Sequence, residues 1–281
     1  MKRLLPAVAV CAVIVFVLRL LGTFDFPARE TVYTVVSVLL FVGGGMILKV
    51  MSPEVRFRRF FAMRPLKKGD FGILVWLTVL VMSGSLLLNY LSVIVFSAFG
   101  KQIPVSSFAS LDTGGILLRL LYAAVIPAIF EEFFFRGAVL SYLNEDRSRT
   151  VKALLLSSVL FALVHGSYYY IVSNIFAGVV FGLIIYMTGS LYVAVLSHFL
   201  SNSLSYLLYM NADKLEDSSS AKLMMCILGL LFLVALYRSL GSFIKRYKRQ
   251  LRDERPMMNE GDKVWQAKKE ERRQRKKSQN S

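Results

Sequence analysis

Two adjacent acids and an arginine interrupt an apolar segment near the middle of the 281-residue chain. Glu132 and Arg136 are four residues apart, so on a helix they share a face and can pair. Such pairing lowers the cost of burial, which is roughly 2.5 to 3.5 kcal/mol for one charged side chain at the centre of a membrane helix. Glu131 points about 100° away and has no partner in its own helix. We therefore predict that Glu132 and Arg136 support the structure, whereas Glu131 is free for chemistry.

The two histidines of the chain, His165 and His198, both lie in a 60-residue stretch (153–212) without Asp, Glu, Lys or Arg. Asn202 follows His198 by four residues and therefore lies on the same helix face. With the unpaired glutamate, these groups comprise a general base, two polarising or proton-relaying side chains and an amide donor for an oxyanion. Ser197 is adjacent to His198 but points away from it. The set therefore favours hydrolysis by activated water over a serine nucleophile.

A metal site is an alternative use of the same side chains. A catalytic zinc ion typically has three protein ligands and one water. Glu131, His165 and His198 could supply those three ligands. The spacing of a zinc-binding HExxH helix is absent, so the local sequence does not require a metal. We therefore favour a metal-free reaction, and Zn²⁺ bound by these three residues is the alternative.

The composition predicts the elements that hold these residues. Hydrophobic residues make up 56% of the chain and charged residues 19%, against about 45–50% and 25% in soluble domains. This excludes an ordinary soluble enzyme and a disordered protein. Because a membrane helix needs about 20 apolar residues, we predict an all-α polytopic transmembrane bundle of about eight spans. They are Leu4–Leu21, Thr31–Leu48, one within Phe71–Gly100, one from Gly115 through Phe135, three starting near Ala153, Tyr169 and Ser190, and the short Leu223–Tyr237.

The distribution of Lys and Arg predicts the orientation. The segment Lys49–Asp70 contains seven of them, whereas Gly22–Glu30 contains only Arg29. Both termini are therefore predicted to be cytoplasmic, in a multi-pass protein of the cell membrane. A helical rise of 1.5 Å per residue places the unpaired glutamate, the histidines and the asparagine roughly 12–18 Å from the cytoplasmic ends of three spans. We expect these groups to meet in one layer of the cytoplasmic half.

Four segments are predicted along the chain. Residues 1–111 hold N-terminal spans and a basic cytoplasmic loop, and residues 112–210 form the core that carries the candidate site. Residues 211–237 form an outer loop and the last span, and residues 238–281 form a basic cytoplasmic tail. The tail contains 15 of the 34 Lys and Arg residues and six acids. We interpret it as a solvated tail held near anionic lipid, and not as a nucleic-acid site, because no binding motif accompanies the charge.

Five short motifs follow one another along the core of the chain. They are E-E-x-x-x-R at 131–136, F-x-x-x-H at 161–165, F-A-G-V-V-F-G at 176–182, T-G-S-L at 188–191 and H-x-x-x-N at 198–202. In this order they resemble the motifs of the CPBP family, which contains the type II CAAX prenyl endopeptidases and the Abi-type and bacteriocin-processing membrane proteins. The resemblance covers about residues 115–208, a third of the chain.

The resemblance implies an all-helical core with an intramembrane endopeptidase site. It implies that Glu131 activates water, and that His165, His198 and Asn202 position this water and stabilise the oxyanion. Glu132 and Arg136 carry over as supporting residues. Members of the family are often labelled metalloproteases, but a glutamate-dependent reaction without an obligatory metal also fits these residues.

We therefore predict an endopeptidase that cleaves a membrane-associated protein or peptide near the cytoplasmic leaflet. Its partners would be this substrate and the lipid bilayer, and no nucleic acid. One alternative is a non-catalytic membrane scaffold or bacteriocin self-immunity protein with the same fold. Another is a proton-coupled transporter, because Glu and His chains also relay protons in membranes. Repeated halves, which many transporters show, are absent from the sequence.

Overall fold

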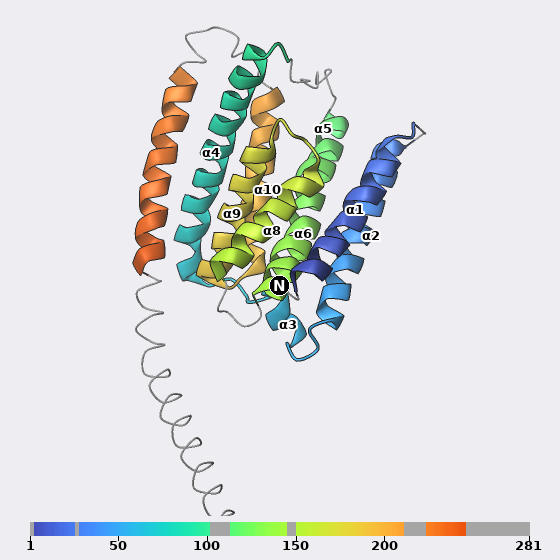
Figure 1. The fold of residues 1–281 in the computed structure, drawn as a ribbon. Coiled ribbons are helices and arrows are strands. Elements are labelled where there is room, and N and C mark those ends of the chain that lie inside the picture. The colour runs from blue at the N-terminus through green and yellow to red at the C-terminus, as the bar shows by residue number, and fades with distance from the viewer. Residues whose placement is uncertain (1–2, 26–27, 102–112, 145–149, 211–222, 246–281) are drawn as a thin grey trace, which may run out of the picture. The chain divides into compact units, whose positions relative to one another are not determined.

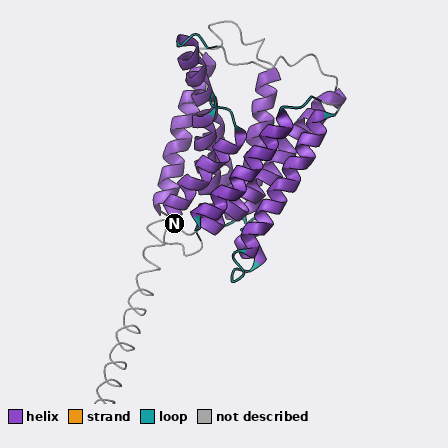
Figure 2. Cartoon of the chain, turned by 45° about the vertical axis from the view of Figure 1, so that its right-hand side comes forward, coloured by secondary structure: helices purple, strands orange, loops and turns teal. Residues whose placement is uncertain are grey.

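The computed structural model describes residues 3–25, 28–101, 113–144, 150–210 and 223–245, and these residues form helices joined by short loops (Figures 1 and 2). This confirms the predicted all-α bundle. The predicted outer loop before the last span and most of the basic tail lie outside the described residues. The chain divides into two compact units, residues 1–236 and 237–281, and the described part of the second unit is helical.

The helices agree in position with the eight predicted spans. They are α1 Leu4–Gly22, α2 Arg29–Val50, the short α3 Phe57–Phe60 and η1 Lys68–Asp70, α4 Phe71–Ala98, a continuous run of α5 Thr113–Leu120, η2 Leu121–Val125, α6 Ile126–Glu132, η3 Phe133–Val139 and α7 Leu140–Leu143, then α8 Thr150–His165, α9 Ile171–Thr188, α10 Leu191–Met210 and a final helix Leu223–Lys245.

Six of these helices are long and apolar enough to cross a membrane by themselves: α1, α2, η1 with α4, α9, α10 and the final helix. The final helix was predicted to end at Tyr237, but it continues to Lys245. The prediction was too short because Arg238 ends the apolar run without ending the helix. Helix α8 has only 16 residues and stops at His165, so this histidine lies at a helix end.

The helix that carries the two acids, residues 113–143, contains two π-helical segments, η2 and η3. A π-helical segment uses i→i+5 hydrogen bonds, and it is frequently found at functional sites. Helix α10 packs against η2, α6 and η3, and α2 packs against α6 and η3. The acid-bearing helix therefore lies between α2 and α10.

Two hydrophobic clusters hold the bundle together. The first joins α1, α2, η3 and α8, and includes the buried Ile14, Leu48, Phe134 and Phe161. The second joins α4, α9, α10 and the final helix, and includes the buried Leu77, Val81, Ile184, Val193 and Ala235. The site described below lies on the helices of the first cluster and on α10.

Close backbone packing joins α8 to α9. A Cβ atom at Gly178 of α9 would lie 2.8 Å from Ser158 Cβ and 2.9 Å from Ser158 Cα, which belong to α8. We expect Gly178→Ala to lower the stability by about 1–3 kcal/mol, because overpacking forces backbones apart. The matched control is Gly43→Ala in α2, where an added Cβ meets no atom within 4 Å. Thermal unfolding in detergent checks the prediction, and equal stability of the two variants would contradict it.

The orientation predicts a labelling pattern. In a chain with Cys11 and Cys226 changed to Ala, an impermeant thiol reagent should label Thr23→Cys on intact cells. It should label Ser278→Cys, which lies outside the described residues, only after the cells are opened. The reason is the excess of Lys and Arg in the loop after α2. Labelling of Ser278→Cys on intact cells would overturn the predicted topology.

Candidate active site

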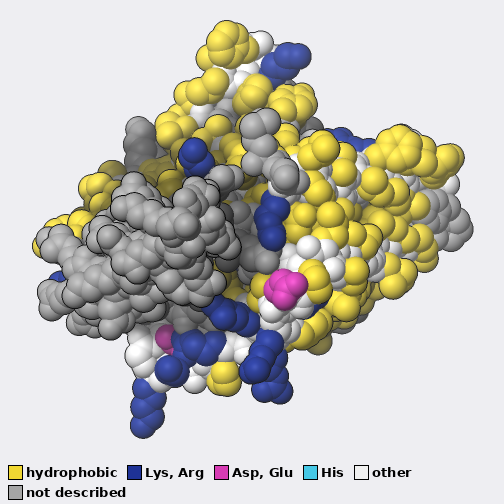
Figure 3. All heavy atoms as spheres, turned by 60° about the horizontal axis from the view of Figure 1, so that its bottom comes forward, with side chains coloured by type: hydrophobic (Ala, Val, Ile, Leu, Met, Phe, Trp, Pro, Cys, Tyr) yellow, Lys and Arg dark blue, Asp and Glu magenta, His cyan; other side chains and the backbone are white. Residues whose placement is uncertain are grey.

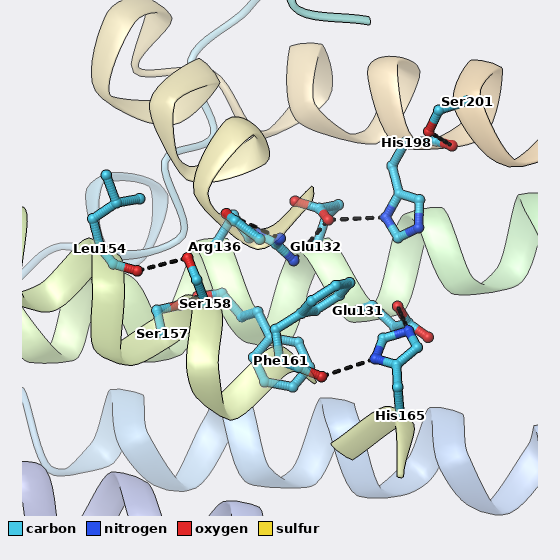
Figure 4. Close-up of polar contacts among 12 residues, drawn as sticks. Glu131, Glu132, Arg136, Leu154, Ser157, Ser158, Phe161, His165, His198 and Ser201 are labelled. Atoms are coloured by element: carbon cyan, nitrogen blue, oxygen red, sulfur yellow. Dashed lines mark hydrogen bonds and ion pairs between the residues drawn. The ribbon is translucent and has the colours of Figure 1, made fainter. Parts of the chain in front are cut away.

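Glu131 and His165 come together from two helices, with Glu131 Oε2 3.5 Å from His165 Nε2 (Figure 4). His165 Nδ1 lies 2.8 Å from the carbonyl oxygen of Phe161, four residues earlier in α8. A carbonyl oxygen only accepts hydrogen bonds, so Nδ1 carries a proton, and Nε2 presents a lone pair to Glu131 when the ring is neutral. Glu131 Oε2 is buried and has no hydrogen-bond donor among the described residues. With a neutral ring, Glu131 Oε2 and His165 Nε2 are two acceptors that face each other, and a water molecule can donate a hydrogen bond to both.

The pair lines a cavity of about 240 Å³ between α1, α2, α6 and α8. A water molecule takes up about 30 Å³ in the liquid, so the cavity has room for water and part of a peptide. Its wall includes hydroxyl residues that were not predicted from the sequence: Tyr33, Thr34 and Ser37 of α2, and Tyr122 of η2. The spacing of Tyr33 and Ser37, which puts both on one helix face, is the sequence feature that could have identified them.

Glu132, Arg136 and His198 form a second, deeper cluster. Glu132 Oε1 lies 2.9 Å from Arg136 Nη1, and the two side chains are 0% and 1% exposed. This confirms the ion pair that their spacing predicts. The same carboxylate oxygen lies 2.9 Å from His198 Nδ1, a contact between helices that was not predicted. A carboxylate on one ring nitrogen sets the tautomer and orientation of an imidazole, so Nδ1 donates and Nε2 is left for chemistry.

Aromatic rings surround this second cluster. The Arg136 guanidinium lies 4.2 Å from the Phe161 ring centroid and 5.2 Å from that of Phe181, which are cation–π distances. The Phe181 ring also stacks on His198, with centroids 4.7 Å apart. Phe161 thus contacts both parts of the site, because its ring covers Arg136 while its carbonyl oxygen holds His165.

Asn202 lies one turn after His198 on α10, and its amide nitrogen donates to the carbonyl oxygen of Ala123 in η2 over 3.2 Å. Ala123 is eight residues before Glu131, about 12 Å along a helix axis. Ser197 faces α4, where Thr78 donates a hydrogen bond to it, in agreement with its predicted direction. The structure thus places the four candidate catalytic residues on the acid-bearing helix and on the helices beside it. Glu131 contacts His165 directly, whereas His198 contacts the supporting residue Glu132.

The structure brings together only two of the three predicted zinc ligands. Glu131 and His165 are neighbours, whereas His198 directs Nδ1 to Glu132. Among the described residues, no three His, Cys, Asp or Glu side chains lie in a group that could hold a metal ion. The donors in this arrangement therefore do not fit a three-ligand zinc site.

Chelation tests the metal-free alternative. We expect thorough removal of divalent metal to leave peptidase activity unchanged, since a carboxylate base needs no Lewis acid. His198→Ala should still lower turnover, because it removes the group that Glu132 orients. Metal analysis of the purified protein accompanies the assay. Stoichiometric zinc that is lost together with activity, and restores it when added back, would overturn this expectation.

The cavity lies nearer to the α1–α2 connection than to the basic segment after α2. Its lining residues from α2 lie at positions 33–41 of the helix Arg29–Val50, and its α1 residue is Leu18. The depth of the site in a membrane stays a prediction.

These features define an integral membrane protein of several apolar helices with buried Glu, His and Arg side chains at one site. Residues 113–204 match the family model described as "Type II CAAX prenyl endopeptidase Rce1-like", so this part of the chain is similar to that family of CAAX proteases. The match contains the acids, both histidines and Asn202, and it confirms the resemblance seen in the motifs. Neither the curated proteins nor the solved structures contain a significant match to the chain.

Proposed function

We propose that the protein is an intramembrane endopeptidase in which Glu131 activates a water molecule. The observation that carries the proposal is the approach of Glu131 Oε2 to within 3.5 Å of His165 Nε2 at the wall of a cavity. The Rce1-like match supports the same class of activity. The substrate is a membrane-associated protein or peptide, since the cavity is lined by helices of a membrane bundle.

The reaction follows from the hydrogen-bonding capacity of each group. Glu131 accepts one proton from water as the water oxygen attacks the peptide carbonyl, while His165 Nε2 accepts from the second O–H and holds the lone pair in line. The proton on Glu131 then passes to the leaving amine. The Asn202 amide has two N–H donors, of which one is used by Ala123. We assign the other to the oxyanion, which requires that the bound peptide reach from Glu131 to Asn202.

The second cluster would act through His198. Its orientation is held by Glu132, whose charge is in turn offset by Arg136. We propose that His198 is the second polarising group of the site and that Glu132 and Arg136 are positioning residues. From the sequence alone, Glu132 and Arg136 were predicted only to support the structure.

Hydrolysis in isotopic water tests the proposal. The full chain is placed in lipid nanodiscs with candidate membrane-associated peptides, including prenylated peptides with a CAAX terminus, which the match to a CAAX prenyl endopeptidase family suggests. Cleavage in H₂¹⁸O should add one heavy oxygen to the new carboxyl terminus, and Glu131→Gln should show no cleavage. Equal cleavage by the wild type and the Glu131→Gln variant would refute the assignment.

A further inference from the structure

A second cavity, of about 530 Å³, lies at the other end of the bundle and shares no residue with the candidate active site. It is formed by the segment before α4, the first turn of α4 and the start of α10. Its apolar lining consists of Leu66, Phe71, Leu74 and Val193. Lys67, Lys68 and Asp70 complete the lining.

The lysines carry the uncompensated charge of this cavity. Asp70 Oδ2 is 2.5 Å from Arg64 Nη2 and also accepts a hydrogen bond from the Lys67 backbone N–H over 2.8 Å. The single acid is therefore neutralised by an arginine. The side chains of Lys67 and Lys68 form no hydrogen bond or ion pair with another described residue and are exposed. The cavity thus has a net positive charge beside an apolar wall.

The segment that presents the lysines is held by hydrogen bonds to the α9–α10 connection. Arg64 Nε donates to the Thr188 carbonyl oxygen over 2.6 Å, and Ser190 Oγ donates to the Arg64 carbonyl oxygen over 2.7 Å. The Leu191 N–H donates to the carbonyl oxygen of Ala62 over 2.8 Å. These hydrogen bonds hold the segment in place without a ligand. The cavity is therefore preorganised, which lowers the conformational entropy lost on binding.

The position of the cavity indicates what enters it. Helices α4 and α10 are candidate membrane spans, and the cavity lies at the N-terminal end of both. Phe71 and Leu66 are 69% and 50% exposed, so apolar surface continues outward from the cavity next to the lysines. Other Lys and Arg side chains gather on the same end of the molecule (Figure 3). A basic pocket between membrane helices is suited to the headgroup of an anionic lipid.

We propose that this cavity binds an anionic phospholipid of the leaflet that surrounds it. The headgroup phosphate lies between Lys67 and Lys68, and the glycerol and upper acyl chain lie against Phe71 and Leu74. The site differs from the basic tail, because it is a shaped cavity in the described part of the chain.

The competing explanation is a diffuse attraction of the whole basic segment to any anion. The segment offers a matched control, because Arg58 and Arg59 are exposed like the lysines but do not line the cavity. Changing either pair to Gln removes two positive charges, but only the change of Lys67 and Lys68 removes them from the cavity.

Lipid-dependent stabilisation of the purified full chain provides the test. Thermal unfolding is measured in detergent with phosphatidylglycerol, with phosphatidylcholine and with inorganic phosphate, and bound lipid is counted by native mass spectrometry. We expect phosphatidylglycerol alone to stabilise the wild type. The apparent affinity should fall at least tenfold in Lys67→Gln/Lys68→Gln and less than twofold in Arg58→Gln/Arg59→Gln. Leu66→Trp, which keeps both lysines but fills the cavity from its exposed side, should also lower the affinity at least tenfold.

Three results would overturn the proposal. An equal loss in the lysine and arginine variants would show diffuse attraction. Equal stabilisation by inorganic phosphate would show a free-anion site. Unchanged affinity in Leu66→Trp would show that the lipid does not occupy this cavity, whether or not the lysine variant folds.

Discussion

Glu131→Gln should lower peptide-bond cleavage at least 100-fold while the protein remains folded. General-base catalysis by a positioned side chain contributes roughly 10²- to 10⁴-fold, and an amide cannot take the proton from water. The stability should change little, because Gln has the volume of Glu and Oε2 of Glu131 accepts no hydrogen bond from the described residues. Turnover in nanodiscs and the thermal midpoint in detergent are measured on the same preparations.

A second variant separates this effect from a general disturbance of the cavity. Ser37 lines the same cavity from α2, and its hydroxyl donates to backbone carbonyls of its own helix. Ser37→Ala should therefore retain most of the activity. Full activity of Glu131→Gln would assign the base to another residue, and the same loss in both variants would point to the shape of the cavity.

Glu132→Gln should unfold the protein more readily, with a loss of about 3–5 kcal/mol, which is typical when one partner of a buried ion pair is removed. The Arg136 guanidinium is 1% exposed. Its remaining neighbours would be the Gly178 carbonyl oxygen and the surrounding aromatic rings. Unfolding midpoints in detergent measure the effect. Expression should fall together with them, because marginal stability lowers the steady-state amount of protein in cells.

The double variant Glu132→Gln/Arg136→Met removes both charges and should recover much of the stability, since apolar replacement of a buried pair is often neutral or better. Its activity should stay low, because His198 would still lack the carboxylate that orients it. Recovery of stability without activity would separate the structural role of the pair from its positioning role. If Glu132→Gln alone were as stable as the wild type, the ion pair would have no structural role.

Local features of the site could be read from the sequence. The pairing of Glu132 with Arg136 depends on helical periodicity alone, which operates within one element, and the structure bears it out. The same holds for the direction of Ser197 away from His198. The positions of the spans follow from the lengths of apolar runs, except where a helix continues past its apolar part, as it does to Lys245.

Contacts between helices were decided by the tertiary structure. Sequence spacing identified two glutamates and two histidines but did not say that His165 meets Glu131 while His198 meets Glu132. It did not reveal that Tyr33 of α2 lines the cavity. These contacts depend on the rotation and register of one helix against another, which are set by the packing of side chains from distant segments. Periodicity gives the face of a helix on which a residue lies, but only packing determines which residue on another helix it meets.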